Sequence, residues 1–208
     1  MEGLAITTLV PMPEMTPGQV GAIRNEAINF VVARAMKELG MGREKLVVRD
    51  VRPVADLASY STGTTVSTIE HWKYSPAAAA AGWVAFTPTT GTMGDNKFVC
   101  FFGIRDLGGH VGLASAGPTA TDLACNPGAP AITFIKFNVG GADKVTWDCT
   151  GARAYNDKVA FTSSPVLIPQ NSGFVIYYYL AAHADTAIMT FFQLIGVTVE
   201  PRGLTISP

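Results

Sequence analysis

Charged residues are scarce in this chain. Of its 208 residues, 15 are Lys or Arg and 16 are Asp or Glu, so the formal net charge at pH 7 is −1. The charged fraction is 15%, whereas an ordinary globular domain has about 25%. This composition excludes a protein that holds nucleic acid through bulk positive charge. Because 48% of the residues are hydrophobic, it also excludes a disordered chain.

Cysteine and histidine are rare as well, and neither is spaced for chemistry. Cys100, Cys125 and Cys149 form no CxxC pair, so we expect buried, reduced thiols. The three histidines stand far apart, and no phosphate-binding glycine loop or calcium loop is present. The nearest approach to a nucleophile elbow, at 113–117, lacks its first glycine. The sequence therefore predicts no enzyme, no catalytic residue, no metal and no cofactor.

Signals for secretion or membrane insertion are also missing. The N-terminus opens with an acidic residue, Glu2, and Pro11 and Pro13 interrupt its apolar stretch. The uncharged part between Lys158 and Asp185 is broken by prolines and polar residues, which a membrane span would avoid. We expect a soluble protein that is made in the cytoplasm without a signal peptide and has no membrane partner.

One segment near the N-terminus carries the pattern of an amphipathic helix. Thr16 stands at the N-cap position, a proline follows it, and Gln19 lies three residues after the cap, which is the arrangement of a capping box. Apolar residues then recur every three or four positions as far as Leu39, and Gly40 follows as a left-handed stop. We expect residues 1–42 to form an N-terminal arm and one helix.

From residue 43 onward the pattern changes to that of β-strands. Short runs rich in β-branched and aromatic residues alternate with Gly, Pro, Asn and Asp, and Gly140 and Gly141 predict a tight hairpin between two of them. The predicted fold class is a mainly β, jelly-roll-like antiparallel β-sandwich at 43–208 with one N-terminal amphipathic α-helix; 107–130 is expected to be a loop. The expected strands lie near 45–52, 66–74, 83–87, 97–105, 132–139, 144–149, 158–162, 165–168, 174–181 and 187–199.

Two of the expected strands are apolar on both faces. Residues 98–104 and 188–195 carry large hydrophobic side chains at successive positions, so both faces need a cover, either the helix or a neighbouring subunit. In the tyrosine run, strand alternation places Tyr177 and Tyr179 on one face and Tyr178 on the other. The candidates for an assembly interface are Tyr177, Tyr179, Phe191, Phe192 and Phe101.

The C-terminal half of the chain carries a resemblance to a known class of proteins. The segments 165–179 and 189–201 have the strand, corner and strand rhythm of the closing part of a jelly roll. They resemble the small β-sandwich capsid proteins of viruses, especially the cement or decoration proteins of tailed bacteriophages. The resemblance implies a virion protein that forms a homo-oligomer, commonly a trimer, and locks neighbouring shell subunits together without chemistry.

Two functions are open on the sequence alone. The first is a non-enzymatic virion structural protein that stabilises an icosahedral capsid by oligomerising and bridging neighbouring subunits, such as those of the major capsid protein. The alternative is a carbohydrate-binding β-sandwich module or adhesin, in which exposed Trp and Tyr side chains stack on sugar rings. Packing is favoured over sugar binding, because sandwich cores and subunit interfaces use the same aromatic residues. The aromatic residues available for a sugar platform are Trp72, Tyr74, Trp83, Trp147 and Tyr177–Tyr179.

Overall fold

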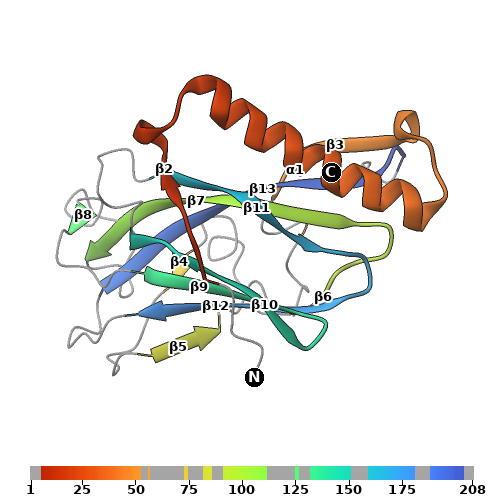
Figure 1. Cartoon of the computed structure of the whole chain (residues 1–208). Helices are drawn as coiled ribbons and strands as arrows, with labels where there is room; N and C mark the ends of the chain where they lie inside the picture. The colour runs from red at the N-terminus through yellow and green to blue at the C-terminus, as the bar shows by residue number, and fades with distance from the viewer. Residues whose placement is uncertain are drawn as a thin grey trace.

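Two β-sheets pack face to face, and one long helix lies over one of them (Figure 1). The mainly β sandwich with a single N-terminal helix is therefore confirmed, while the jelly-roll strand order stays a prediction. The computed structural model describes residues 6–52, 56, 73–74, 82–85, 91–111, 125–126, 132–150, 159–180 and 188–203.

The first sheet has six strands, and its main path follows the order β1-β10-β9-β12-β5. The tight turn predicted at Gly140 and Gly141 joins β9 to β10, and both glycines have positive φ, at 64° and 78°. The sixth strand, β6, pairs with the first residues of β12, whereas β5 pairs with its last residues. The strands are β1 (Ile6–Thr8), β5 (Gly82–Ala85), β6 (Gly91–Thr92), β9 (Ile132–Val139), β10 (Ala142–Asp148) and β12 (Gly173–Leu180).

The second sheet has seven strands in the order β2-β11-β7-β13-β3, with β4 beside β13 and β8 beside β7. The prediction of a loop at 107–130 is wrong for its first five residues. Residues 107–111 continue β7 and lie beside β13. The two strands expected at 158–162 and 165–168 are one strand with an irregular register. The strands are β2 (Val10–Pro11), β3 (Leu46–Asp50), β4 (Lys73–Tyr74), β7 (Phe98–Val111), β8 (Cys125–Asn126), β11 (Val159–Ile168) and β13 (Ile188–Pro201).

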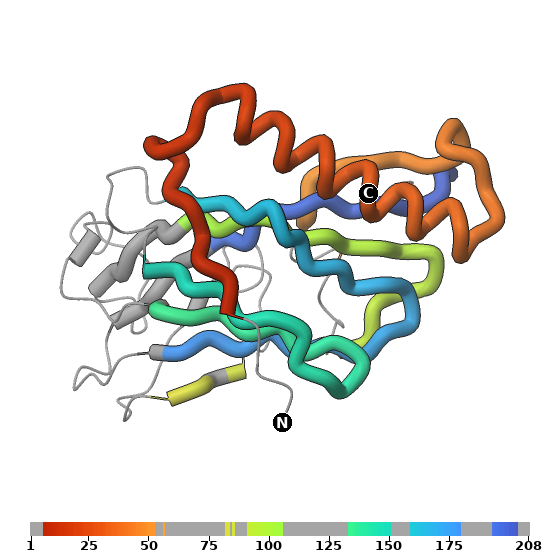
Figure 2. Tube along the Cα trace, in the orientation of Figure 1, coloured from red at the N-terminus to blue at the C-terminus, as the bar shows by residue number. Residues whose placement is uncertain are grey.

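The N-terminal arm crosses from one sheet to the other (Figure 2). Its strand β1 pairs in parallel with β10 of the first sheet, and β2 then pairs antiparallel with β11 of the second. Leu9, between the two strands, is buried in the core. The arm, which the sequence assigns to residues 1–42, therefore adds strands to both sheets of the sandwich expected at 43–208. Short 3-10 helices at Met12–Glu14 and Arg43–Lys45 flank the long helix.

The helix α1 (Pro17–Leu39) begins and ends where the sequence predicts. The backbone N–H of Thr16 donates to Oε1 of Gln19 at 2.7 Å, and the N–H of Gln19 donates to Oγ1 of Thr16 at 3.3 Å. These reciprocal bonds satisfy donors that the first turn leaves free. Gly40 then takes a left-handed conformation with φ 64° and ends the helix.

Two apolar cores explain the strands that are hydrophobic on both faces. On β7, Phe98, Cys100 and Phe102 point to α1, whereas Val99 and Phe101 point into the space between the sheets. The helix therefore supplies the cover that these strands need. Phe101 is wrong as an interface candidate, because its side chain is 0% exposed.

Candidate interaction surface

One outer sheet face has no helix over it among the residues that the structure describes. The helix packs on β7, β11 and β13 of the seven-stranded sheet, and the far side of the six-stranded sheet has no helix over it in the described part of the chain (Figure 1). On β9, residues Ile135, Phe137 and Val139 are buried toward the core, so Phe134 and Lys136 lie on the outer side.

Strand registers place these side chains in two rows that cross the sheet. Residues directly opposite one another on paired strands share a face and lie close enough to touch. We call the two rows together the outer face. The first row is Thr8, Asp148, Phe134, Tyr179 and Trp83, and the second is Ile6, Thr146, Lys136, Tyr177 and Ala85.

Three aromatic rings of the first row pack edge to face. The ring centroids of Trp83 and Tyr179 are 5.4 Å apart with an interplanar angle of 74°, and those of Phe134 and Tyr179 are 6.2 Å apart at 71°. Such pairs contribute about 0.5–1.5 kcal/mol each beyond the area they bury. Trp83 is nevertheless 42% exposed. The rings are thus held in place while one of them still faces solvent.

Lys136 contacts aromatic residues of both rows. Its Nζ lies 5.0 Å from the ring centroids of both Trp83 and Tyr177, within the range of a cation–π contact. The same Nζ is 3.1 Å from Oδ2 of Asp143, whose Oδ1 accepts a hydrogen bond from Nδ2 of Asn138 at 2.7 Å. The hydrogen bond from Asn138 lowers the pKa of Asp143 below its ordinary value; burial opposes this shift, and the hydrogen bond and charge of Lys136 add to it. The outer face therefore combines packed aromatic rings with a lysine whose charge is paired with a neighbouring carboxylate.

The interface candidates from the sequence have different outcomes. Tyr177 and Tyr179 lie on the outer face, half-buried, with Tyr178 buried on the other side, so the predicted alternation is confirmed. Phe191 and Phe192 lie on β13, but their side chains fall outside the described residues. Phe101 is in the core.

Sequence reasoning missed part of this surface. The sequence suggests Trp83 only as part of a sugar platform, and it does not mark Phe134 or Lys136 as surface candidates. A signal was present, because on β9 residues 134, 136 and 138 alternate with three apolar residues that turn out to be buried. What the sequence did not contain is the register that sets these side chains beside Tyr177 and Tyr179.

Two observations on the described residues bear on metal and thiol chemistry. Among them, no group of three or more His, Cys, Asp or Glu side chains is placed to hold a metal ion. Cys100 and Cys149 are buried and belong to no disulfide, as predicted, whereas the side chain of Cys125 lies outside the described residues. Burial raises the pKa of the Cys100 thiol to about 12, so this cysteine stays protonated at neutral pH and is a poor nucleophile. Of the helices described, none combines the length and apolarity that crossing a membrane requires.

Comparison of the chain with protein-family models, with curated proteins and with solved structures gives no match in any of the three. The class of the protein therefore follows from its own geometry. It is a two-sheet β-sandwich in which a helix covers one outer face and an aromatic surface lies on the other.

Proposed function

We propose that this protein is a non-enzymatic structural subunit of a virion shell, which forms a homo-oligomer and bridges neighbouring subunits through its outer face. The observation that carries the proposal is that α1 covers the outer side of one sheet, whereas no described helix covers the outer side of the other. The helix buries the apolar outer side of the seven-stranded sheet, while the rings around Trp83 have no equivalent cover in the described part of the chain.

The chemistry of the outer face fits a protein partner. Binding energy at interfaces is concentrated in Trp, Tyr and Arg side chains near the centre of the contact. Here Trp83, Tyr177 and Tyr179 lie side by side, and their edge-to-face and cation–π contacts hold them in place before a partner arrives. Ordering fewer side chains on binding lowers the entropy that association costs.

The net charge and the resemblance both support a shell. A formal charge of −1 puts little electrostatic repulsion between copies packed closely together. The virion setting, the trimer and the contact with a major capsid protein rest on the resemblance of the C-terminal strands to small capsid proteins. Repetition of one modest interface over a closed shell strengthens the whole assembly by avidity.

Light scattering of the purified chain over a range of concentrations tests the proposal. The expected result is a discrete oligomer, with a trimer as the predicted size. A monomer that persists at high concentration contradicts it.

A carbohydrate-binding module is a second candidate, and a specific observation favours it. The exposed ring of Trp83 packs against the hydroxyl-bearing Tyr179, and Lys136 over the same ring also contacts Tyr177 and the carboxylate of Asp143. Sugar sites combine an aromatic plane with polar groups in this way. A glycan array separates the two candidates. If the chain stays monomeric and binds a saccharide, and Trp83→Ala abolishes that binding, the result favours the carbohydrate-binding module. If the chain forms an oligomer and binds no glycan, the result favours the shell subunit.

A further inference from the structure

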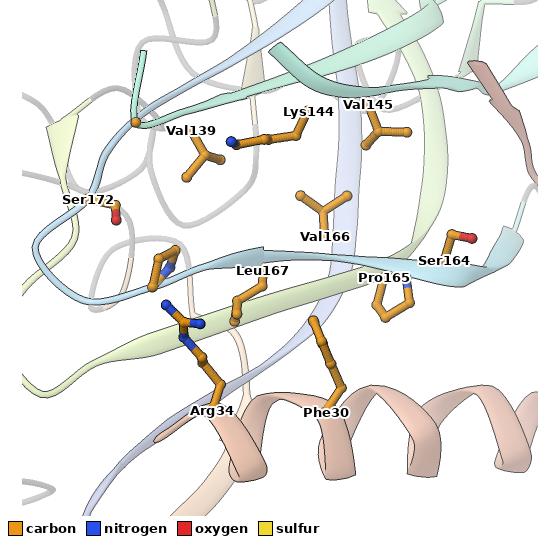
Figure 3. Close-up of a pocket in the computed structure, with 12 residues that line it drawn as sticks. Phe30, Arg34, Val139, Lys144, Val145, Ser164, Pro165, Val166, Leu167 and Ser172 are labelled. Carbon is orange, nitrogen blue, oxygen red and sulfur yellow. The ribbon is translucent and has the colours of Figure 1, made fainter. Parts of the chain in front are cut away.

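A groove runs along the open side of the sandwich, on a different part of the molecule from the outer face. It has a cavity volume of about 480 Å³ and lies between α1, β10 and β11. Figure 3 shows Phe30 and Arg34 extending from α1 toward β11, with Lys144 and Val145 on the side of β10. We call it the lateral groove.

The N-terminal arm closes only part of this open side. Strand β2 pairs with Ala160 and Phe161 of β11 and no further, and β1 pairs with β10 only from Thr146 to Asp148. In the described residues, β11 beyond Phe161 therefore has a strand neighbour on one side only, which is β7. The lateral groove lies along this free stretch of β11, because Ser164–Leu167 line it.

A free strand edge offers backbone groups to an incoming strand. In an antiparallel sheet, alternate N–H and C=O groups of an edge strand point away from its neighbour. The arm of this protein already uses such pairing at Phe161, where β2 adds to the same strand. An extended segment that continues along β11 would lie in the lateral groove and would complete the row that β2 begins.

The lining shows which side chains such a segment would carry. The floor is apolar, with Val145, Val166 and Leu167, and Phe30 on the wall is 48% exposed. The charged side chains in the lining are Arg34 and Lys144, and the lining contains no Asp or Glu. Arg34 pairs through Nε with Glu38, whereas Lys144 has no ion pair in the described part of the chain. An apolar groove with two cations complements a segment that is both apolar and acidic.

The edge is poorly suited to a second copy of itself. Pro165 has no backbone N–H, and the N–H of Ser164 donates to Oγ1 of Thr162 at 3.0 Å. Two copies of β11 placed edge to edge would both lack these donors, which is how natural sheets discourage open-ended pairing. A segment from a different chain can supply the N–H groups that this edge lacks.

We propose that the lateral groove binds a short extended segment of another protein in which apolar side chains alternate with acidic ones. The segment adds as a strand beside residues 163–168 of β11, its apolar side chains contact Phe30 and Val166, and its carboxylates pair with Lys144 and Arg34. The inference does not depend on the outer face.

A peptide library tests the proposal on the full chain. Random heptapeptides displayed on phage are selected on the immobilised protein, and the enriched sequences are synthesised with a fluorescein label and measured by fluorescence polarisation. The expected sequences combine acidic with apolar residues, and their affinity falls as salt is added.

Variants locate the binding. Lys144→Glu should weaken it about tenfold or more, because the charge reversal replaces attraction by repulsion. Phe30→Ala, a truncation of an exposed side chain, should also weaken it. Lys37→Glu changes the same charge at an exposed position of α1 outside the groove lining and should have no effect, as should Trp83→Glu on the outer face.

Three results would overturn the proposal. They are a selection that enriches no peptide, enriched peptides that carry no acidic residue, and equal affinity of the wild type and Lys144→Glu. If a second copy fills the groove instead, the wild type will self-associate in a way that Lys144→Glu abolishes while no peptide binds, and that result also contradicts it. Association through the groove and association through the outer face are distinguished by the variants, because Lys144→Glu acts on the groove and Trp83→Glu acts on the outer face.

Discussion

The guanidinium of Arg49 holds the carboxylate of Asp56 with two hydrogen bonds, from NH1 to Oδ2 at 2.7 Å and from NH2 to Oδ1 at 2.6 Å. The side chain of Asp56 is 0% exposed. Arg49 lies on β3 and also donates through Nε to Glu200 on β13, at 2.9 Å. This cluster joins the edge strand of the seven-stranded sheet to its neighbour and to the segment that follows β3.

Removing one charge from this pair should be costly. A buried ion whose partner is lost stays desolvated without compensation, which costs about 3–5 kcal/mol. Asp56→Asn should therefore lower the free energy of unfolding by about 3 kcal/mol in urea titrations, since Glu200 still compensates part of the Arg49 charge. Asp50→Asn is the matched control. Its ion pair with Arg24 is exposed, so its effect should stay below about 1 kcal/mol, and an equal loss in both variants would contradict this account.

The same carboxylate should make the fold sensitive to acid. Burial opposes ionisation of Asp56, but hydrogen bonds from Arg49 and from the N–H of Arg52, with the charges of Arg49 and Lys97, outweigh it and hold its pKa below the ordinary value of 3.8. A carboxylate whose pKa is lower in the folded state stabilises the fold above its unfolded pKa, and this contribution is lost as the pH falls through the folded value. The wild-type unfolding free energy should thus decrease below about pH 4, more steeply than that of Asp56→Asn. Parallel curves would contradict the assignment.

Gly196 should tolerate no side chain. A Cβ at this position on β13 would lie 2.5 Å from the carbonyl oxygen of Cys100 and 2.7 Å from Cδ1 of Phe101, so the backbone of β7 would have to move. Gly196→Ala should destabilise the protein by roughly 1–3 kcal/mol. Gly21→Ala is the control, because Gly21 lies exposed in α1 with no atom near its added Cβ, and this change should stabilise by roughly 0.5–1 kcal/mol. Equal effects of the two changes on the urea midpoint would show that the contact at Gly196 is unimportant.

Features that depend on local chemistry could be predicted from the sequence. The capping box of Thr16 and Gln19, the left-handed Gly40 and the hairpin at Gly140 each need only a few neighbouring residues, and each is present. The strand periodicity likewise gave the sandwich, because alternation along one strand already separates inner from outer positions.

Features that depend on distant pairing could not be predicted. Arg49 and Glu200 are 151 residues apart in sequence, and no local sequence pattern predicts their contact. The sequence makes Phe101 an interface candidate because its strand is apolar on both faces. The structure shows that both faces of this strand are covered, one by α1 and the other by the second sheet. The lateral groove was missed for the same reason, since it exists only where the arm stops pairing.

The central claim is that the outer face mediates assembly, and sedimentation velocity of two matched variants tests it most directly. Trp83→Glu places a charge at the exposed end of the aromatic row, on β5, whereas Phe30→Glu places the same charge at an exposed aromatic position on α1. Both changes are at exposed sites, so circular dichroism should show a native fold in each. The account predicts an oligomer for the wild type and for Phe30→Glu and a monomer for Trp83→Glu. A Trp83→Glu protein that sediments as the same oligomer as the wild type would contradict it.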